Sequence, residues 1–142
     1  MSAAIRYVYD DGGRAAAGYK GHTTDCSCRA VAIATGQPYQ MVYDALNALG
    51  KRERGRPGGA RTGVKTATLR KYLASLGWRW VPTMHIGSGC TRHLLAEELP
   101  AGRIIARVSG HVCAVLDGVI HDIYDPSRGG TRCVYGYWRQ AE

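Results

Sequence analysis

One cysteine and one histidine occupy positions where nucleophilic chemistry can arise. Cys26 lies at the predicted start of a helix, after a loop that contains glycine and threonine. The exposed amides and the dipole of a helix N-terminus lower the pKa of a thiol and favour the reactive thiolate. His111 follows a Ser-Gly pair at the predicted start of a strand. A neutral imidazole there can accept the thiol proton, so we predict a Cys–His nucleophile pair.

A third side chain is needed to orient the imidazole ring. An Asp-Gly pair predicts a tight turn between strands at 111–116 and 119–124, so the second strand returns toward His111. A turn of two or three residues brings Asp125 into the neighbourhood of the ring. Asp122 shares the face of His111 in the two-residue register, but it lies nearer the middle of its strand. We prefer Asp125 as the orienting acid and keep Asp122 as the alternative.

The segments around these residues resemble papain-like cysteine peptidases. Residues 25–34 (DCSCRAVAIA) look like the nucleophile helix of that superfamily, 110–115 (GHVCAV) like its histidine strand, and 123–127 (IYDPS) like its strand end with an Asp-Pro pair. The resemblance is closest to compact bacteriocin-leader-processing peptidases and to small phage-encoded proteins of papain-like fold. It spans most of the chain between residues 25 and 127.

The resemblance implies a role for each residue. Cys26 is the expected nucleophile, His111 the general base and Asp125 the orienting acid. Peptidases of this type usually carry a glutamine six residues before the nucleophile, where it donates to the oxyanion. Lys20 occupies that position here. Lys20 is therefore an oxyanion candidate as a cationic donor, with the Cys26 backbone N–H as the other source.

Two other uses of the cysteines compete with this interpretation. Cys28 could be the nucleophile, but it lies inside the first helical turn and would point away from a site served by Cys26, so we expect a core residue. A structural zinc site could use His22, Cys26, Cys28, Cys113 and His121. Their spacing lacks the paired ligand motifs of zinc proteins. We expect neither a metal nor another cofactor.

The termini and the cysteine count indicate the compartment. The N-terminal residues lack a basic stretch followed by an apolar run, and no apolar run approaches the ~18 residues of a membrane span. We predict a cytoplasmic protein, in the host cytoplasm if it is phage-encoded. A reducing compartment disfavours structural disulfides. Cys90 and Cys133 have no partner motif, so we assign them no role.

Positive charge is concentrated in one segment. Residues 51–71 hold eight basic side chains and one acidic one, so they supply +7 of the net charge of +8. The segment has little aromatic interleaving and no nucleic-acid motif, so no specific nucleic-acid partner is expected. A solvated surface explains the charge most simply. The alternative hypothesis is a catalytically silent papain-like protein that uses this segment to bind an acidic partner.

The elements that must position these residues predict an α+β fold. Helices precede an expected antiparallel meander, so the helices would carry the cysteine and the sheet the histidine and aspartate. We expect one domain over 1–142, with a basic loop rich in glycine and proline at 51–63. The predicted helices are 26–35, 38–49, 66–76 and a short one within 88–99; the predicted strands are 5–9, 78–81, 103–108, 111–116, 119–124 and 133–138.

These inferences combine into a hypothesis about function. The protein is expected to be a cysteine hydrolase, either a peptidase or an isopeptidase, that forms an acyl-enzyme on a peptide or protein substrate, with acidic substrates among the candidates. An amidase, a deamidase or an acyl transferase would use the same groups.

Overall fold

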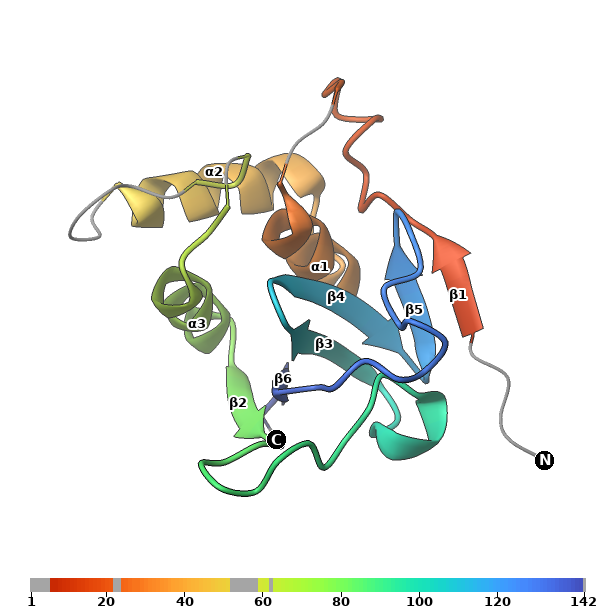
Figure 1. The fold of residues 1–142 in the computed structure, drawn as a ribbon. Helices are drawn as coiled ribbons and strands as arrows, with labels where there is room; N and C mark the ends of the chain where they lie inside the picture. The colour runs from red at the N-terminus through yellow and green to blue at the C-terminus, as the bar shows by residue number, and fades with distance from the viewer. Residues whose placement is uncertain (1–5, 22–23, 52–58, 62, 142) are drawn as a thin grey trace.

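The computed structural model describes residues 6–21, 24–51, 59–61 and 63–141, and within them the chain is of mixed α and β structure. The predicted α+β class is therefore confirmed. Three α-helices and one short 3-10 helix accompany one sheet in these ranges (Figure 1). The helices are α1 (Cys26–Thr35), α2 (Tyr39–Gly50), α3 (Thr66–Ser75) and η1 (Ala96–Glu98). The strands are β1 (Arg6–Tyr9), β2 (Trp78–Pro82), β3 (Arg103–Val108), β4 (His111–Leu116), β5 (Val119–Asp122) and β6 (Gly136–Gln140).

Helix α1 is the structural centre of the helical layer. Its alanines, valine and isoleucine are buried, because it packs along β4 (Figure 1). It ends at Gly36, whose φ of 75° is left-handed and whose N–H bonds the Ala32 carbonyl. The Arg103 guanidinium donates to the carbonyls of Ile33 and Ala34, which places a cation at the negative end of the helix dipole. The predicted bounds of this helix are confirmed.

The sheet is only partly the predicted meander. Its order is β1-β5-β4-β3-β6-β2, and β3, β4 and β5 form consecutive antiparallel pairs. The meander prediction is wrong for its last strand, because β6 pairs antiparallel with β3 rather than with β5. β1, for which no partner was predicted, pairs parallel with β5. The connection between β5 and β6 is long enough to carry the chain across the sheet, and local sequence patterns do not reveal such a crossing.

Two of the predicted strands differ from the structure by more than one residue at an end. β5 ends at Asp122 instead of residue 124, because the Asp122 side chain accepts the N–H of Ile123 and takes it out of the ladder. β6 begins at Gly136 instead of residue 133, because Cys133 forms an isolated bridge with His93. Each shifted strand end therefore lies at a residue whose side chain or bridge replaces regular strand pairing, Asp122 in β5 and Cys133 before β6.

The sheet separates two apolar clusters. The helices α1, α2 and α3 cover one face and pack against residues such as Ile105 and Ala114. On the other face, Leu94, Leu99 and Val134 pack on residues such as Val115. The second cluster fixes the segment that leads from β2 to β3. None of the helices in the described ranges has both the length and the apolarity that a bilayer crossing requires.

Candidate active site

Cys26 is the first residue of α1, and its sulfur contacts the start of β4. The His111 side chain and the backbone N–H of Val112 lie near enough to the thiol to act on it as hydrogen-bonding partners. Burial alone would raise the pKa of the Cys26 thiol. The hydrogen bonds from His111 and Val112, with the positive charges of His111 and Arg29, outweigh burial and lower this pKa. The predicted Cys–His pair is thus brought together at a helix N-terminus.

His111 joins Cys26 to a carboxylate. The ring is buried, and its Nε2 lies 2.6 Å from an Asp122 carboxylate oxygen. Because Nε2 is engaged there, Nδ1 is the ring nitrogen left available to the thiol. Burial lowers the pKa of His111, but the hydrogen bonds to Asp122 and Cys26 and their negative charges raise it to about 9. A thiol with a lowered pKa beside an imidazole with a raised one favours a thiolate–imidazolium pair.

The preference for Asp125 as the partner of the ring is corrected by this geometry. The Asp125 carboxylate instead accepts the Ser127 N–H at 2.9 Å. The reason is the register of the hairpin. Leu116 faces Val119 across a two-residue turn, so the side chain of Asp122 emerges on the same side of the hairpin as that of His111. Asp125 lies beyond the end of β5, where its carboxylate serves the following turn.

The turn that fixes this register has the expected chemistry. Asp117 and Gly118 occupy left-handed conformations, with φ of 49° and 78°. Aspartate tolerates this region and glycine adopts it freely, which suits a tight hairpin turn. The Asp117 carboxylate also accepts the N–H of Gly102 at 2.7 Å and ties the turn to the start of β3.

A buried arginine links the two acidic ends of the site, and the sequence analysis missed it. Arg29 lies one helical turn after Asp25 and forms an ion pair with it. Its other guanidinium nitrogen lies 3.3 Å from Asp122. Asp25 is further bonded by the Tyr39 hydroxyl at 2.7 Å, and the Arg14 guanidinium lies 3.5 Å away. Only the i, i+4 spacing of an acid and a base could have indicated this network from sequence.

The network changes the role of Asp25. Asp25 is the N-cap residue of α1 by position, yet its side chain caps no helix amide. Its carboxylate is used by Arg29, Tyr39 and Arg14 instead. The first-turn amides of α1, next to Cys26, therefore lack a side-chain cap and remain suited to an anionic oxygen.

One aromatic ring lies against the histidine. The rings of Tyr124 and His111 have centroids 5.2 Å apart. Tyr124 is itself about half exposed. It therefore lies between the imidazole and solvent and limits the exposure of His111.

Lys20 is not brought to the sulfur by any contact recorded for the described residues. Its side chain is exposed, and its carbonyl accepts the Arg14 guanidinium at 3.0 Å. It lines a hollow of about 180 Å³ with Arg14, Tyr19, Tyr39, Tyr43 and Arg61. The role of Lys20 as an oxyanion donor stays a prediction.

The residues of the two alternative uses of cysteine, a Cys28 nucleophile and a zinc site, lie in separate surroundings. Cys28 is fully buried and donates to the Tyr39 carbonyl, and burial raises the pKa of its thiol to about 12. Burial also raises the pKa of Cys113. His121 pairs with an aspartate, Asp10, at 3.0 Å. His22 lies outside the described residues. Among those described, no three His, Cys, Asp or Glu side chains are grouped to hold a metal ion.

Cys90 and Cys133, to which the sequence assigned no role, form a disulfide. This corrects the expectation that structural disulfides are disfavoured. The two residues are 43 positions apart, and their Cα atoms lie 5.8 Å from each other. The isolated bridge between His93 and Cys133 aligns the two segments. This long-range pairing has no signature in the local sequence.

The basic segment is only partly described. Residues 52–58 and 62 lie outside the described ranges. In the described part, the Arg70 guanidinium lies 5.4 Å from the centre of the Trp80 ring, which is a cation–π arrangement. The interpretation of 51–71 as a patch for an acidic partner therefore stays a prediction.

Comparisons with known proteins add no relative. The chain matches no model of a protein family, and neither the curated proteins nor the solved structures include one with significant similarity. The functional interpretation therefore depends on the residues and geometry of this chain.

Proposed function

We propose that this protein is a cysteine hydrolase that uses Cys26 as nucleophile, His111 as acid–base and Asp122 as the orienting carboxylate. One observation carries the proposal: the Cys26 thiol, the His111 ring and the Asp122 carboxylate lie in sequence at the start of a helix, with the ring 2.6 Å from the carboxylate and coupled to the thiol. The same order of groups activates the nucleophile in other cysteine hydrolases. The resemblance to papain-like peptidases implies the same chemistry.

The expected reaction forms and breaks one thioester. The Cys26 thiolate attacks an acyl carbon, and the carbonyl oxygen becomes an oxyanion next to the first-turn amides of α1. The His111 imidazolium gives its proton to the leaving amine as the C–N bond breaks. His111 then takes a proton from water, whose oxygen attacks the thioester. The acid is released, and the thiolate and imidazolium are restored.

Arg29 supports this chemistry as a positioning residue. It contacts Asp122 but has no recorded contact with the Cys26 sulfur. Asp122 accepts from Arg29 and from the Ile123 N–H through one oxygen, which leaves the other for His111. The carboxylate is thus fixed at both ends. A fixed carboxylate holds the ring in the orientation that serves the sulfur.

A peptide or protein with an acidic side chain is the substrate class that suits the surroundings. The hollow lined by Lys20 is also lined by Arg14, Arg61 and three tyrosines. The Arg14 guanidinium and the Tyr39 hydroxyl are already paired with Asp25. Lys20 and Arg61 are therefore the cationic residues of the lining that would receive a carboxylate ligand. An amide substrate would present its acidic side chain to this hollow.

Alkylation with iodoacetamide between pH 6 and 9 tests the activated thiol. A free thiol such as glutathione loses reactivity as pH falls below the pKa of its thiol. Because the pKa of Cys26 is lowered, its rate should fall less steeply than that of glutathione, and Cys26 should react before the buried Cys28 and Cys113. Equal pH dependence for Cys26 and glutathione would contradict the proposal.

A p-nitrophenyl ester tests the acyl-enzyme step. Release of p-nitrophenol should show a burst, and mass spectrometry should find the acyl group on Cys26. With an amide substrate, turnover should decline above pH about 9, because deprotonated His111 cannot protonate the leaving amine. A burst without an adduct on Cys26 would contradict the assigned nucleophile.

A further inference from the structure

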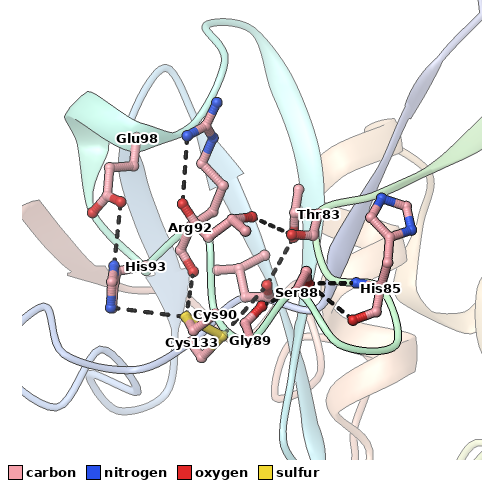
Figure 2. The surroundings of a disulfide bond; sticks show 11 residues. Thr83, His85, Ser88, Gly89, Cys90, Arg92, His93, Glu98 and Cys133 are labelled. Carbon is pink, nitrogen blue, oxygen red and sulfur yellow. Dashed lines mark hydrogen bonds and ion pairs between the residues drawn. A yellow bond between two sulfur atoms is a disulfide. The ribbon is translucent and has the colours of Figure 1, made fainter.

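The disulfide lies in a small assembly of polar groups outside the candidate active site. Figure 2 shows His93 between Cys90 and Glu98, with a dashed contact on each side of the ring. The Cys90 sulfur lies 3.8 Å from Nε2 of His93. Nδ1 of the same ring lies 3.2 Å from a Glu98 carboxylate oxygen. One sulfur of the disulfide is thus coupled to a proton-carrying ring and a carboxylate.

Solvent reaches this assembly. Cys90 is exposed, Cys133 is half-buried, and the side chain of His93 is 40% exposed. A groove of about 550 Å³ lies beside it and includes Glu98 in its wall. A small thiol can therefore reach the sulfur–sulfur bond. A disulfide that serves only as a buried staple has neither the access nor the adjacent ring.

Backbone contacts hold the two segments together independently of the disulfide. The N–H of Leu94 bonds the Arg132 carbonyl at 2.9 Å, and the N–H of Val134 bonds the Arg92 carbonyl at 2.8 Å. These bonds lie on either side of Cys133 in the chain. After reduction they would keep the Cys90 and Cys133 thiols close to each other. The pair can then close again without a search through unfolded conformations.

We propose that Cys90 and Cys133 form a thiol–disulfide exchange site for low-molecular-weight thiols, with His93 as its acid–base. A thiolate attacks the Cys133 sulfur, the S–S bond breaks, and its electron pair goes to the Cys90 sulfur. His93 gives a proton from Nε2 to that sulfur. The first thiolate is now joined to Cys133 in a mixed disulfide. A second external thiolate attacks the external sulfur of this mixed disulfide and releases Cys133. The two external thiols leave as a disulfide, and the protein gains two thiols.

The direction of attack follows from the ring. In thiol exchange the sulfur whose thiolate is better stabilised is the better leaving group. Among the described residues, a ring nitrogen lies beside the Cys90 sulfur and none lies beside that of Cys133, so Cys90 leaves and Cys133 is attacked. Oxidation by a disulfide reverses the steps, with His93 taking the Cys90 proton.

Glutathione is the probe for the experiment. The full chain is equilibrated with reduced or oxidised glutathione, trapped by acid and alkylated with isotopic tags. Peptides that contain Cys90, Cys133 and Cys26 are then quantified separately. We expect Cys90 and Cys133 to change state together and reversibly. Because Cys26 is measured in the same digest, failure at this pair is distinct from failure of the proposed nucleophile.

Two histidine variants test the role of the ring. His93→Gln should slow reduction by glutathione at pH 7 about tenfold. His85→Gln, in the same loop but without a recorded contact to either sulfur, should leave the rate unchanged. Melting temperatures of the oxidised proteins check that both variants are folded, and His93→Asn replaces His93→Gln if that variant is not.

Three outcomes would overturn the proposal. The pair could stay in one state in both glutathione buffers. The rate for folded His93→Gln or His93→Asn could equal that of the unchanged chain. Metal analysis of the isolated protein could find zinc held by Cys90 and Cys133 as thiolates.

Discussion

The described residues contain two sets of a cysteine sulfur, a histidine ring and a carboxylate, and the two sets differ in burial. We call Cys26, His111 and Asp122 the inner chain of groups, and Cys90, His93 and Glu98 the outer chain of groups. In the first, His111 and Asp122 are 8% and 3% exposed, and the thiol is free. In the second, His93 and Glu98 are 40% and 26% exposed, and the sulfur is in a disulfide. Similar groups in similar order therefore occupy different electrostatic environments.

Burial decides what each chain can do. The inner carboxylate is additionally held by Arg29, and the inner ring has a pKa raised to about 9. Charges in that setting interact strongly, because little solvent screens them. At the outer chain, water competes for the same groups and weakens their coupling. We expect the inner chain to respond steeply to mutation and the outer chain weakly.

The largest expected effect is at the inner sulfur. Cys26→Ala removes the nucleophile, so the ester burst and the acyl adduct should disappear and turnover should fall at least about 10³-fold. Cys28→Ala is the matched control, since it removes a thiol from the same helix. The adduct on Cys26 should persist in that variant. Retained turnover in Cys26→Ala would show that the inner chain is not catalytic.

The next largest effect separates two aspartates. Asp122→Asn removes the charge that raises the pKa of His111, so the imidazolium and the thiolate both become less stable. The rate of Cys26 alkylation at pH 6.5 should drop about tenfold, since one unit in a pKa is tenfold in the charged fraction. Asp125→Asn should leave the rate unchanged. The opposite result would restore Asp125 as the orienting acid.

Much of this geometry was predictable from short-range patterns, and the rest was not. The helix start at Cys26 and the Asp-Gly turn follow from local rules, and both are confirmed. The choice between Asp122 and Asp125 required knowledge of the strand-pairing register of the hairpin, because a register shift of one residue turns each side chain to the other face of the sheet. The Cys90–Cys133 bond required a contact between segments 43 residues apart.

Arg29 shows a different limit of sequence reasoning. The pattern DCSCRA identifies the arginine only as a helix residue, and charged residues are usually exposed. Its burial between Asp25 and Asp122 depends on how α1 packs near the end of β5. The ion pairs could be proposed only after that packing was known.

An intermediate effect is expected at Arg29. Arg29→Gln removes the cation that two buried carboxylates share, which should destabilise the fold by about 3–5 kcal/mol in urea unfolding. Arg29→Lys keeps a charge but cannot bridge both carboxylates as a guanidinium does, so it should recover only part of the stability. If Arg29 also positions Asp122, folded Arg29→Lys should shift the pH profile of Cys26 alkylation toward higher pH. An unchanged profile would reduce Arg29 to a structural role.

The smallest effect should come from the outer carboxylate, and it gives the closest test of the comparison. Glu98→Gln makes the same chemical change as Asp122→Asn, but at a partly exposed pair where solvent already screens the charge. The rate at which glutathione reduces the Cys90–Cys133 bond should fall less than about fivefold, since exposed pairs contribute no more than about 1 kcal/mol. Glu97→Gln is the neighbouring control for the loss of one negative charge. A tenfold loss in Glu98→Gln alone would mean that Glu98 orients His93 as strongly as Asp122 orients His111, and burial would then not explain the difference between the two chains.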